Sequence, residues 1–448
     1  VSQSNWATGT LNQTAGTISV SGNVNLSPTA DCSAFLNLSG GTLAVAGTLG
    51  VGQRGLLTGT MTLSGTGVLT AGAMIVADIA NPASPKPSYG QYIQNGGTAT
   101  VGSLLIAKTS ADTNPHAGTF DLNGGTFSTA SITGGVATAG GTNTSLFTFN
   151  GGTLKPTASS AVFMQGLTAA SVKEGGAVID TDGYDVTIAQ ALLHAAGAKA
   201  SPLTKSGAGN LTLSGTNTLL GPVTISGGTL TLAGAAQLAA GNLVSALTNN
   251  GALVFAGSAD QTLSGPVCGS GSLTKNGAGT LALAGATPYT GATAINAGQL
   301  AVASGGALSN SAVTLASGTT LGVQVITGEG QWSCKSLTLS GGTVTAAFRI
   351  HKASLSATTA PVLVSGNLVN NGTLNVTVDG AAVTTGTYPL FRYTGSLTGG
   401  GALGSVTLPN GGAGTLVANG PNQTIDLSVT TAVSPLVWNG GSGDWDID

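Results

Sequence analysis

Charged residues are scarce in this chain. Asp, Glu, Lys and Arg together make up 6% of its 448 residues, against about a quarter in an ordinary soluble domain. The 12 Lys and Arg are scattered, and the formal net charge is −3. Binding to nucleic acid by counterion release needs clustered Lys and Arg. We therefore expect no nucleic-acid partner.

The shortage of acids also argues against catalysis. A β-helix enzyme that cleaves polysaccharide needs several carboxylates and a base on one face. The chain has only two Glu, and its three His (His116, His194 and His351) lie in unrelated segments. No G-x-S-x-G or H-E-x-x-H motif occurs. We expect a protein that is not an enzyme, with a polysaccharide-degrading β-helix enzyme as the less favoured alternative.

Cysteines and long apolar runs are few as well. Cys32, Cys268 and Cys334 have no zinc-ligand spacing and are expected to be small buried side chains. A disulfide between Cys268 and Cys334 stays open. No run of eighteen apolar residues occurs, so no membrane span is expected in this chain. No signal peptide is expected either. Because Val1 is not an initiator, we interpret the chain as processed, a fragment, or one unit of something longer.

Glycine and small polar residues are abundant instead. The chain has 73 Gly, and 41% of its residues are hydrophobic, which is not the composition of a disordered chain. Six successive segments align on the residue after a Gly-containing turn: Thr17, Thr42, Gly67, Thr98, Thr126 and Thr153. The steps between them are 25, 25, 31, 28 and 27 residues. Alternating runs bounded by Gly and Asn are typical of short strands.

This period predicts an all-β fold, a right-handed parallel β-helix (β-solenoid) with about 25–31 residues per coil. Leu, Ile and Val would fill the core, and Thr, Ser and Asn would form outer ladders about 4.8 Å apart. A string of β-sandwiches or a β-propeller is the alternative, although the unit is short for a four-stranded blade. The best helical candidate, residues 188–200, is either one helical turn or another strand.

A longer repeat follows. The sequence "LTKSGAGNLTLSGTNTLLGPVTISGGTLTL" occupies residues 203–232, and "LTKNGAGTLALAGATPYTGATAINAGQLAV" occupies residues 273–302. This pattern resembles the autotransporter-associated β-strand repeat of bacterial passenger domains and giant secreted surface proteins. Residues 178–192 resemble the segment that commonly precedes it. The first copy departs from the pattern at "NTLLGPV", where an aromatic is usual, whereas the second keeps Tyr289. The resemblance implies a secreted β-solenoid at the bacterial cell surface.

Aspartates are densest in "DTDGYD", which contains Asp180, Asp182 and Asp185. Such hard oxygens could bind Ca²⁺, although the segment lacks the length and closing Glu of an EF-hand loop. The other interpretation is a turn that uses Asp and Gly for their backbone preferences. No other cofactor is expected. Aromatics make up 4% of the chain, with no clear platform for a glycan, and Tyr89 and Tyr92 are the candidates.

The two ends of the chain read as halves of one segment. Trp438, Trp445 and Asp446 at one end and Asn5 and Trp6 at the other form a continuous pattern when the ends are joined. It resembles the Trp-rich segment that opens modules in these secreted proteins. Neither end shows a capping helix, and uncapped solenoid ends tend to pair. We therefore expect assembly, either as a covalent tandem polypeptide or as separate subunits.

Together these features divide the chain into four parts. They are Gly/Thr-rich solenoid coils at 1–160, solenoid with the long repeats at 161–302, further coils at 303–436, and a junction at 437–448 that continues into residues 1–10 of a neighbour. The predicted function is structural: an extracellular fibre, filament or surface stalk that associates with itself head to tail. The alternative is an adhesin that binds surface glycans, for example through the proline-rich segment 80–90.

Overall fold

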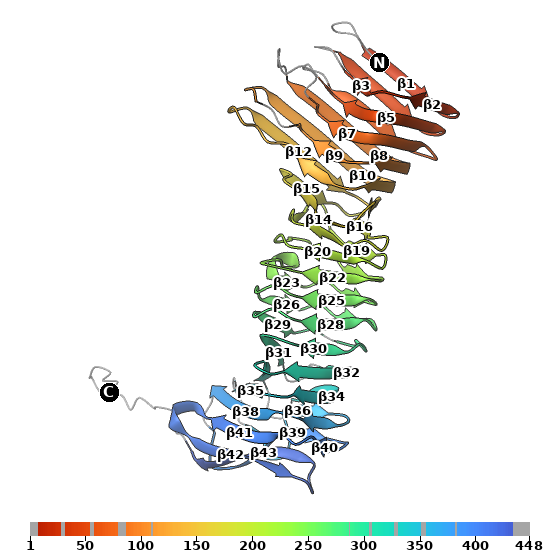
Figure 1. The fold of residues 1–448 in the computed structure, drawn as a ribbon. Helices are drawn as coiled ribbons and strands as arrows, with labels where there is room; N and C mark the ends of the chain where they lie inside the picture. Colours follow the sequence, from red (N-terminus) through yellow and green to blue (C-terminus); the bar gives the residue numbers. More distant parts are fainter. Residues whose placement is uncertain are drawn as a thin grey trace, which may run out of the picture. The chain divides into compact units, whose positions relative to one another are not determined.

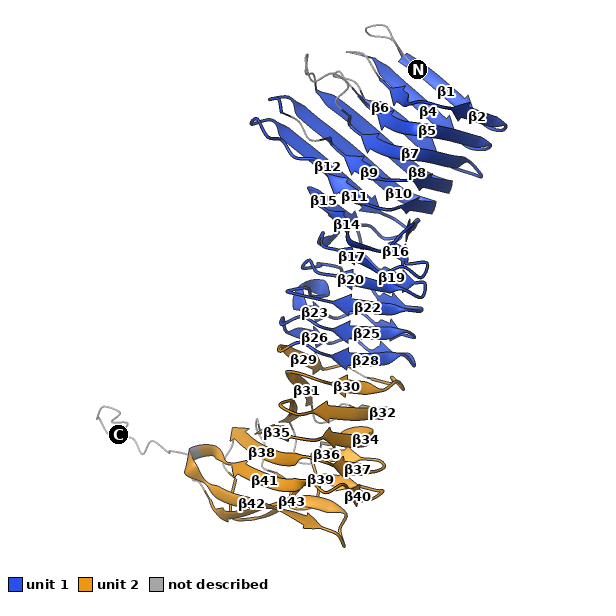
Figure 2. Ribbon diagram, in the orientation of Figure 1, with its two compact units in different colours: residues 1–277 blue, residues 278–448 orange. Residues whose placement is uncertain are grey.

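The computed structural model describes residues 8–27, 32–53, 58–78, 87–108, 111–285, 287–303, 307–326, 330–350, 355–380 and 383–432. Within them the regular structure is β-strand apart from two short 3₁₀ turns, η1 (Ala239–Gly241) and η2 (Pro409–Gly411). None of the described segments forms an apolar helix long enough to cross a membrane. The chain divides into two compact units, residues 1–277 and 278–448 (Figure 2).

The strands of the first unit are short and stack coil upon coil (Figure 1). They are β1 (Thr8–Gln13), β2 (Thr17–Val20), β3 (Val24–Leu26), β4 (Ser33–Leu38), β5 (Thr42–Val51), β6 (Gly59–Leu63), β7 (Val68–Val76), β8 (Ser88–Val101), β9 (Leu104–Ile106), β10 (Pro115–Thr129), β11 (Ile132–Gly134), β12 (Thr142–Phe149), β13 (Thr153–Pro156), β14 (Ser160–Gln165), β15 (Ala169–Val172), β16 (Ala177–Asp180), β17 (Val186–Ile188), β18 (Leu192–His194), β19 (Leu203–Ser206), β20 (Asn210–Leu213), β21 (Val223–Ile225), β22 (Thr229–Leu232), β23 (Asn242–Leu243), β24 (Leu247–Asn249), β25 (Ala252–Phe255), β26 (Gln261–Leu263), β27 (Val267–Cys268) and β28 (Ser272–Lys275).

Each strand of this unit pairs in parallel with its counterpart one coil later. β1 pairs with β4, β4 with β6, and β6 with β8, which makes one ladder. A second ladder runs through β2, β5 and β7, and a third through β7, β9 and β11. Three ladders of parallel strands are the arrangement of a β-solenoid, so the predicted fold is confirmed.

The alternation within the strands explains this stacking. In β4 the residues Ala34, Leu36 and Leu38 are buried, while their neighbours are more exposed. Successive side chains of a strand point to opposite faces, so the apolar residues of every coil face one core. Aromatic rings stack there as well. Phe120 lies between Tyr92 and Phe147, with ring centroids 4.6 and 4.8 Å away and interplanar angles of 23° and 9°.

The repeat spacing predicts most of the register. Thr17 pairs with Thr42, and Thr98, Thr126 and Thr153 stack in one column. The one error is Gly67, because Thr42 pairs with Val68 instead. The physical reason is local, since the Gly67 N–H donates to the Ser64 carbonyl and closes the turn one residue later than predicted.

Coils become shorter after the first third. Lys205 pairs with Ile225, 20 residues on, and Ile225 pairs with Asn249, 24 residues on. The segment 188–200 is strand and turn, since β17 ends at Ile188 and β18 covers Leu192–His194. All three cysteines are free thiols.

Asparagine ladders form on the outside of the solenoid, as the composition predicts. The Asn123 amide donates to Asn95 Oδ1 at 2.9 Å, and the Asn150 amide donates to Asn123 Oδ1 at 3.1 Å. Asn37 donates to Asn12 in the same way at 2.8 Å. Uncharged amides can stack at the strand spacing without the repulsion that like charges would suffer.

The second unit continues with longer strands. They are β29 (Thr280–Leu283), β30 (Thr293–Ile295), β31 (Gln299–Ala303), β32 (Ala307–Ala316), β33 (Thr320–Val325), β34 (Trp332–Ser340), β35 (Thr343–Ile350), β36 (Val362–Val364), β37 (Leu368–Asn370), β38 (Thr373–Gly380), β39 (Gly386–Tyr393), β40 (Leu397–Thr398), β41 (Ala402–Thr407), β42 (Ala413–Asn419) and β43 (Thr424–Thr431).

The end of this unit departs from the parallel pattern. β43 runs antiparallel to both β39 and β42, so the chain turns back on itself between Asn419 and Thr424. The expectation that neither end carries a cap is therefore wrong for the C-terminal side, where an antiparallel strand pair follows the parallel ladders. The sequence signal is "ANGPNQ", residues 418–423, because Asn-Gly and Gly-Pro mark a tight turn between two alternating runs.

Candidate functional site: buried lysines and the Asp180 turn

The first long repeat stacks upon itself. Its opening strands β19 and β20 pair in register with its closing strands β21 and β22, so that Leu203 lies beside Val223 and Leu213 beside Leu232. In the second repeat β29 pairs with β31 in the same way. The thirty-residue pattern therefore encodes one coil together with the two strands that begin the next. This explains why the pattern is longer than the 20-residue coil it closes.

Lys205 of this repeat points into the core. Its side chain has no exposed surface, and its ammonium donates to the carbonyl oxygens of Ser206 at 2.8 Å, Gly207 at 2.8 Å and Gly227 at 3.1 Å. The first two belong to the turn that follows β19, and Gly227 belongs to the equivalent turn one coil later. Lys205 thus satisfies carbonyls that the turn leaves without a strand partner and joins two successive coils.

Lys275 occupies the same position in the second repeat. It is 1% exposed, and its ammonium donates to the Gly277 carbonyl, the counterpart of Gly207. Burial lowers the pKa of Lys205 to about 8, against the opposing charges of Asp180 and Asp185. Burial also lowers the pKa of Lys275, and the charge of Asp260 opposes that shift.

Other coils use an amide where these two use a lysine. The Gln13 amide donates to the Gly16 carbonyl of its own turn and to Thr42 in the next coil, at 3.2 and 2.9 Å. Gln94 makes the equivalent pair of bonds. The amide of Asn249 reaches Ser272, and that of Asn370 reaches Ala402, across coils. An inward donor before a Gly-rich turn is therefore a recurring means of tying one coil to the next, and sequence reasoning missed it.

The three candidate calcium ligands lie on the turn before β17. The Lys155 ammonium lies 3.4 Å from Asp180 and 3.3 Å from Asp182. Asp180 accepts the Asp182 N–H, and Asp182 has a φ of 51°. Asp185 accepts the Asn210 N–H at 2.8 Å. Among the described residues no group of three or more His, Cys, Asp or Glu is placed to hold a metal ion. A lysine shared by two aspartates favours the turn interpretation over calcium binding.

A buried polar group lies elsewhere, around His116. Its Nδ1 is 2.9 Å from Ser88 Oγ, and its Nε2 is 3.1 Å from Asp112 Oδ1. Sequence reasoning missed this group, although Ser88 and His116 are 28 residues apart, as the local repeat requires. These residue types can support nucleophilic catalysis. Here, however, neither Ser88 nor His116 has any exposed surface, so a substrate cannot reach the hydroxyl.

The remaining predicted residues are dispersed. His194 hydrogen-bonds Ser201 at 3.0 Å. Tyr92 is buried in the aromatic stack, and Tyr89 is partly exposed. Several predicted residues lie outside the described part of the chain: His351, most of the segment 80–90, and the junction residues Asn5, Trp6, Trp438, Trp445 and Asp446.

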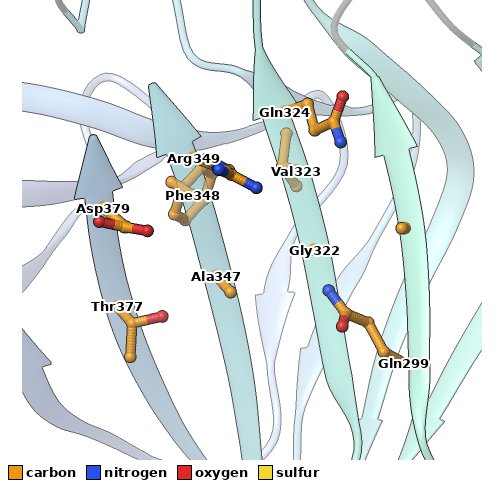
Figure 3. Close-up of a pocket in the computed structure, with 10 residues that line it drawn as sticks. Gln299, Gly322, Val323, Gln324, Ala347, Phe348, Arg349, Thr377 and Asp379 are labelled. Carbon is orange, nitrogen blue, oxygen red and sulfur yellow. The ribbon is translucent and has the colours of Figure 1, made fainter. Parts of the chain in front are cut away.

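The second unit bears a shallow groove of about 270 Å³ on the outer face of β31, β33, β35 and β38 (Figure 3). Small residues form its floor, with Gly322 paired to Ala347 and Ala347 to Thr377. Arg349 and Asp379 lie side by side at one edge. The groove therefore presents both a hydrogen-bond donor and an acceptor beside a flat floor.

Comparison with known families identifies the long repeats. Residues 203–232 and 273–302 each match the family model described as passenger-associated-transport-repeat. No curated protein matches the chain. The matched segments carry the two buried lysines and form the self-stacked coils of a solenoid. The chain is therefore an autotransporter passenger-like β-repeat protein.

Proposed function

We propose that this chain is a structural element of a secreted or surface-bound protein, a solenoid stalk or fibre that grows by adding coils. The passenger-type repeats support this role because such repeats belong to secreted and surface proteins. The observation that carries the proposal is the state of the first coil. Each of β1, β2 and β3 pairs on one side only among the described residues.

The apolar residues of that coil are also incompletely covered. Leu11, Ile18, Val20 and Val24 are half-buried, whereas their partners in the next coil, Leu36, Leu43, Val45 and Leu49, are at most 3% exposed. An open parallel edge beside uncovered apolar side chains favours pairing with another strand. A further coil, from the same polypeptide or from another copy, would satisfy both.

The antiparallel strands β42 and β43 refine the head-to-tail arrangement. A further parallel coil fits the β1–β3 edge, but the antiparallel end offers no matching parallel surface. This difference supports continuation on the N-terminal side, by tandem coils or by pairing of two such edges, over stacking of identical ends.

Electron microscopy and sedimentation of the chain test the proposal. The chain should self-associate, and Ile18→Lys combined with Val20→Lys should abolish association by placing charge on the open edge. The matched control is Val162→Lys, because Val162 is 52% exposed on β14. Monodisperse monomers of the unaltered chain under all conditions, or equal association of the edge variant, would contradict the proposal. An intact-mass measurement of native material separates tandem units from subunits near 43 kDa.

The proposed role includes no catalytic step and no cofactor. The enclosed position of Ser88 and His116 supports the first part, and the pairing of Lys155 with Asp180 and Asp182 supports the second. Adhesion is the second candidate function, because the groove beside Arg349 and Asp379 could bind a surface glycan or protein. A glycan-array signal that Arg349→Ala removes would support it.

A further inference from the structure

Strand β43 has two buried faces. Ile425 and Leu427 are fully buried on one, and Thr424 and Asp426, each 6% exposed, alternate with them. Alternation places Thr424 and Asp426 on the same face. β43 lies between β39 and β42, so the backbone around both side chains is held by hydrogen bonds on either side.

Two polar atoms on this face have no partner. Asp426 Oδ2 accepts the Asn419 amide at 3.0 Å. Asp426 Oδ1 and Thr424 Oγ1 are buried and have no hydrogen-bond partner within the described part of the chain. Buried polar atoms are nearly always satisfied, and a carboxylate oxygen without a donor is costly. Both atoms therefore need donors from outside the chain.

These atoms border a cavity of about 440 Å³, which is within the size range of small-molecule sites. Register places Arg392 on one side of Thr424 and Asn419 on the other, and all three line the cavity with Asp426. The cavity thus combines a guanidinium and an amide, which donate, with a carboxylate and a hydroxyl, which accept.

This combination selects the class of ligand. A guanidinium beside the cavity disfavours a bare cation, and the carboxylate disfavours an anion. A neutral polyhydroxyl molecule suits both, because each hydroxyl group can donate and accept. We propose that this cavity binds a neutral saccharide, whose hydroxyls donate to Asp426 Oδ1 and Thr424 Oγ1 and accept from Arg392. The site is independent of the open edge at β1–β3 and of the assembly proposed for it.

Ligand-observed NMR on the full chain tests this site. The probes are the methyl glycosides of glucose, galactose, mannose and N-acetylglucosamine, with neutral disaccharides of the same sugars. At least one should bind. Asp426→Asn and Thr424→Val should each weaken that binding about tenfold or more, since each removes an acceptor. Asp379→Asn is the matched control, because Asp379 is exposed and lies outside the cavity.

The outcomes separate cleanly. No binding of any probe to the unaltered chain would overturn the proposal, and so would equal binding by the two cavity variants. Calorimetric binding of Ca²⁺ that Asp426→Asn abolishes, without saccharide binding, would assign the cavity to a cation and overturn it as well. If Asp426→Asn fails to fold, as judged by circular dichroism, Thr424→Val decides the question because it preserves the side-chain shape.

Discussion

Lys205 and Gly227 belong to consecutive coils, and the Lys205 ammonium donates to the Gly227 carbonyl at 3.1 Å. The same ammonium binds two carbonyls of its own turn. One side chain therefore holds two stacked Gly-rich turns at the spacing of the solenoid. Gly228 permits this approach, because a Cβ there would lie 2.7 Å from the Lys205 nitrogen, at a φ of 63°.

Replacement of Lys205 should distinguish the hydrogen bonds from the charge. Lys205→Met removes every donor, and we expect it to lower the free energy of unfolding by about 1–3 kcal/mol, because buried carbonyls lose their partner. Lys205→Gln keeps a donor, as Gln13 and Gln94 do at equivalent corners, and should cost less. Urea unfolding followed by circular dichroism measures both. Equal losses for the two variants would show that donation to the turn is not what Lys205 contributes.

The lowered pKa of Lys205 predicts a dependence on pH. Its pKa is about 8 in the folded chain and about 10.4 when unfolded. Between these values the unfolded chain binds more protons, so this group makes stability rise as pH increases from about 8 to about 10.4. Below pH 8 the cost of burying the charge is fully present. Relative to Lys205→Gln, the unaltered chain should gain about 3 kcal/mol across this window. A flat difference between the two proteins would contradict the shift.

Much of this architecture is legible in the sequence, because alternation and Gly-rich turns act locally. Thr98, Thr126 and Thr153 align by eye and stack in the structure. Composition alone does not reveal which inward residues are polar. Lys205 reads as a surface residue until its position two after Leu203, on the same face of the strand, is compared with Leu38 and Gln13 in other coils.

The candidate sites were harder to predict, since they depend on contacts between coils. Ser88 and His116 meet only because one coil here is 28 residues long. The calcium interpretation of Asp180 and Asp182 overlooked Lys155, which a different coil supplies. Asp426 reads as an ordinary polar strand residue, and its burial follows from the antiparallel return of β43 between two strands.

The aromatic stack should be the most sensitive part of the core. Phe120 contacts Tyr92, Phe127 and Phe147, with ring centroids 4.6 to 4.8 Å away. Phe120→Ala would leave a cavity between two coils and should cost about 3–5 kcal/mol. Val162→Ala, at a residue that is 52% exposed, should change stability by less than about 0.5 kcal/mol. Thermal and urea unfolding compare the pair, and similar costs would mean that the ring stack adds little.

Two glycines of the Asp180 region should respond to alanine for different reasons. A Cβ at Gly209 would overlap the Tyr184 carbonyl in the neighbouring coil, although the φ of Gly209 is not positive. Gly183 has open space around it but a φ of 87°. Gly183→Ala should therefore cost about 1–2 kcal/mol through backbone strain alone. Gly209→Ala should cost as much or more, because backbone must move to relieve the overlap. Asn at Gly183 should recover part of the loss, since Asn tolerates the left-handed region, whereas Asn at Gly209 should be worse than Ala. Unfolding free energies of the four variants test this, and rescue of Gly209 by Asn would show that strain rather than crowding sets the cost there.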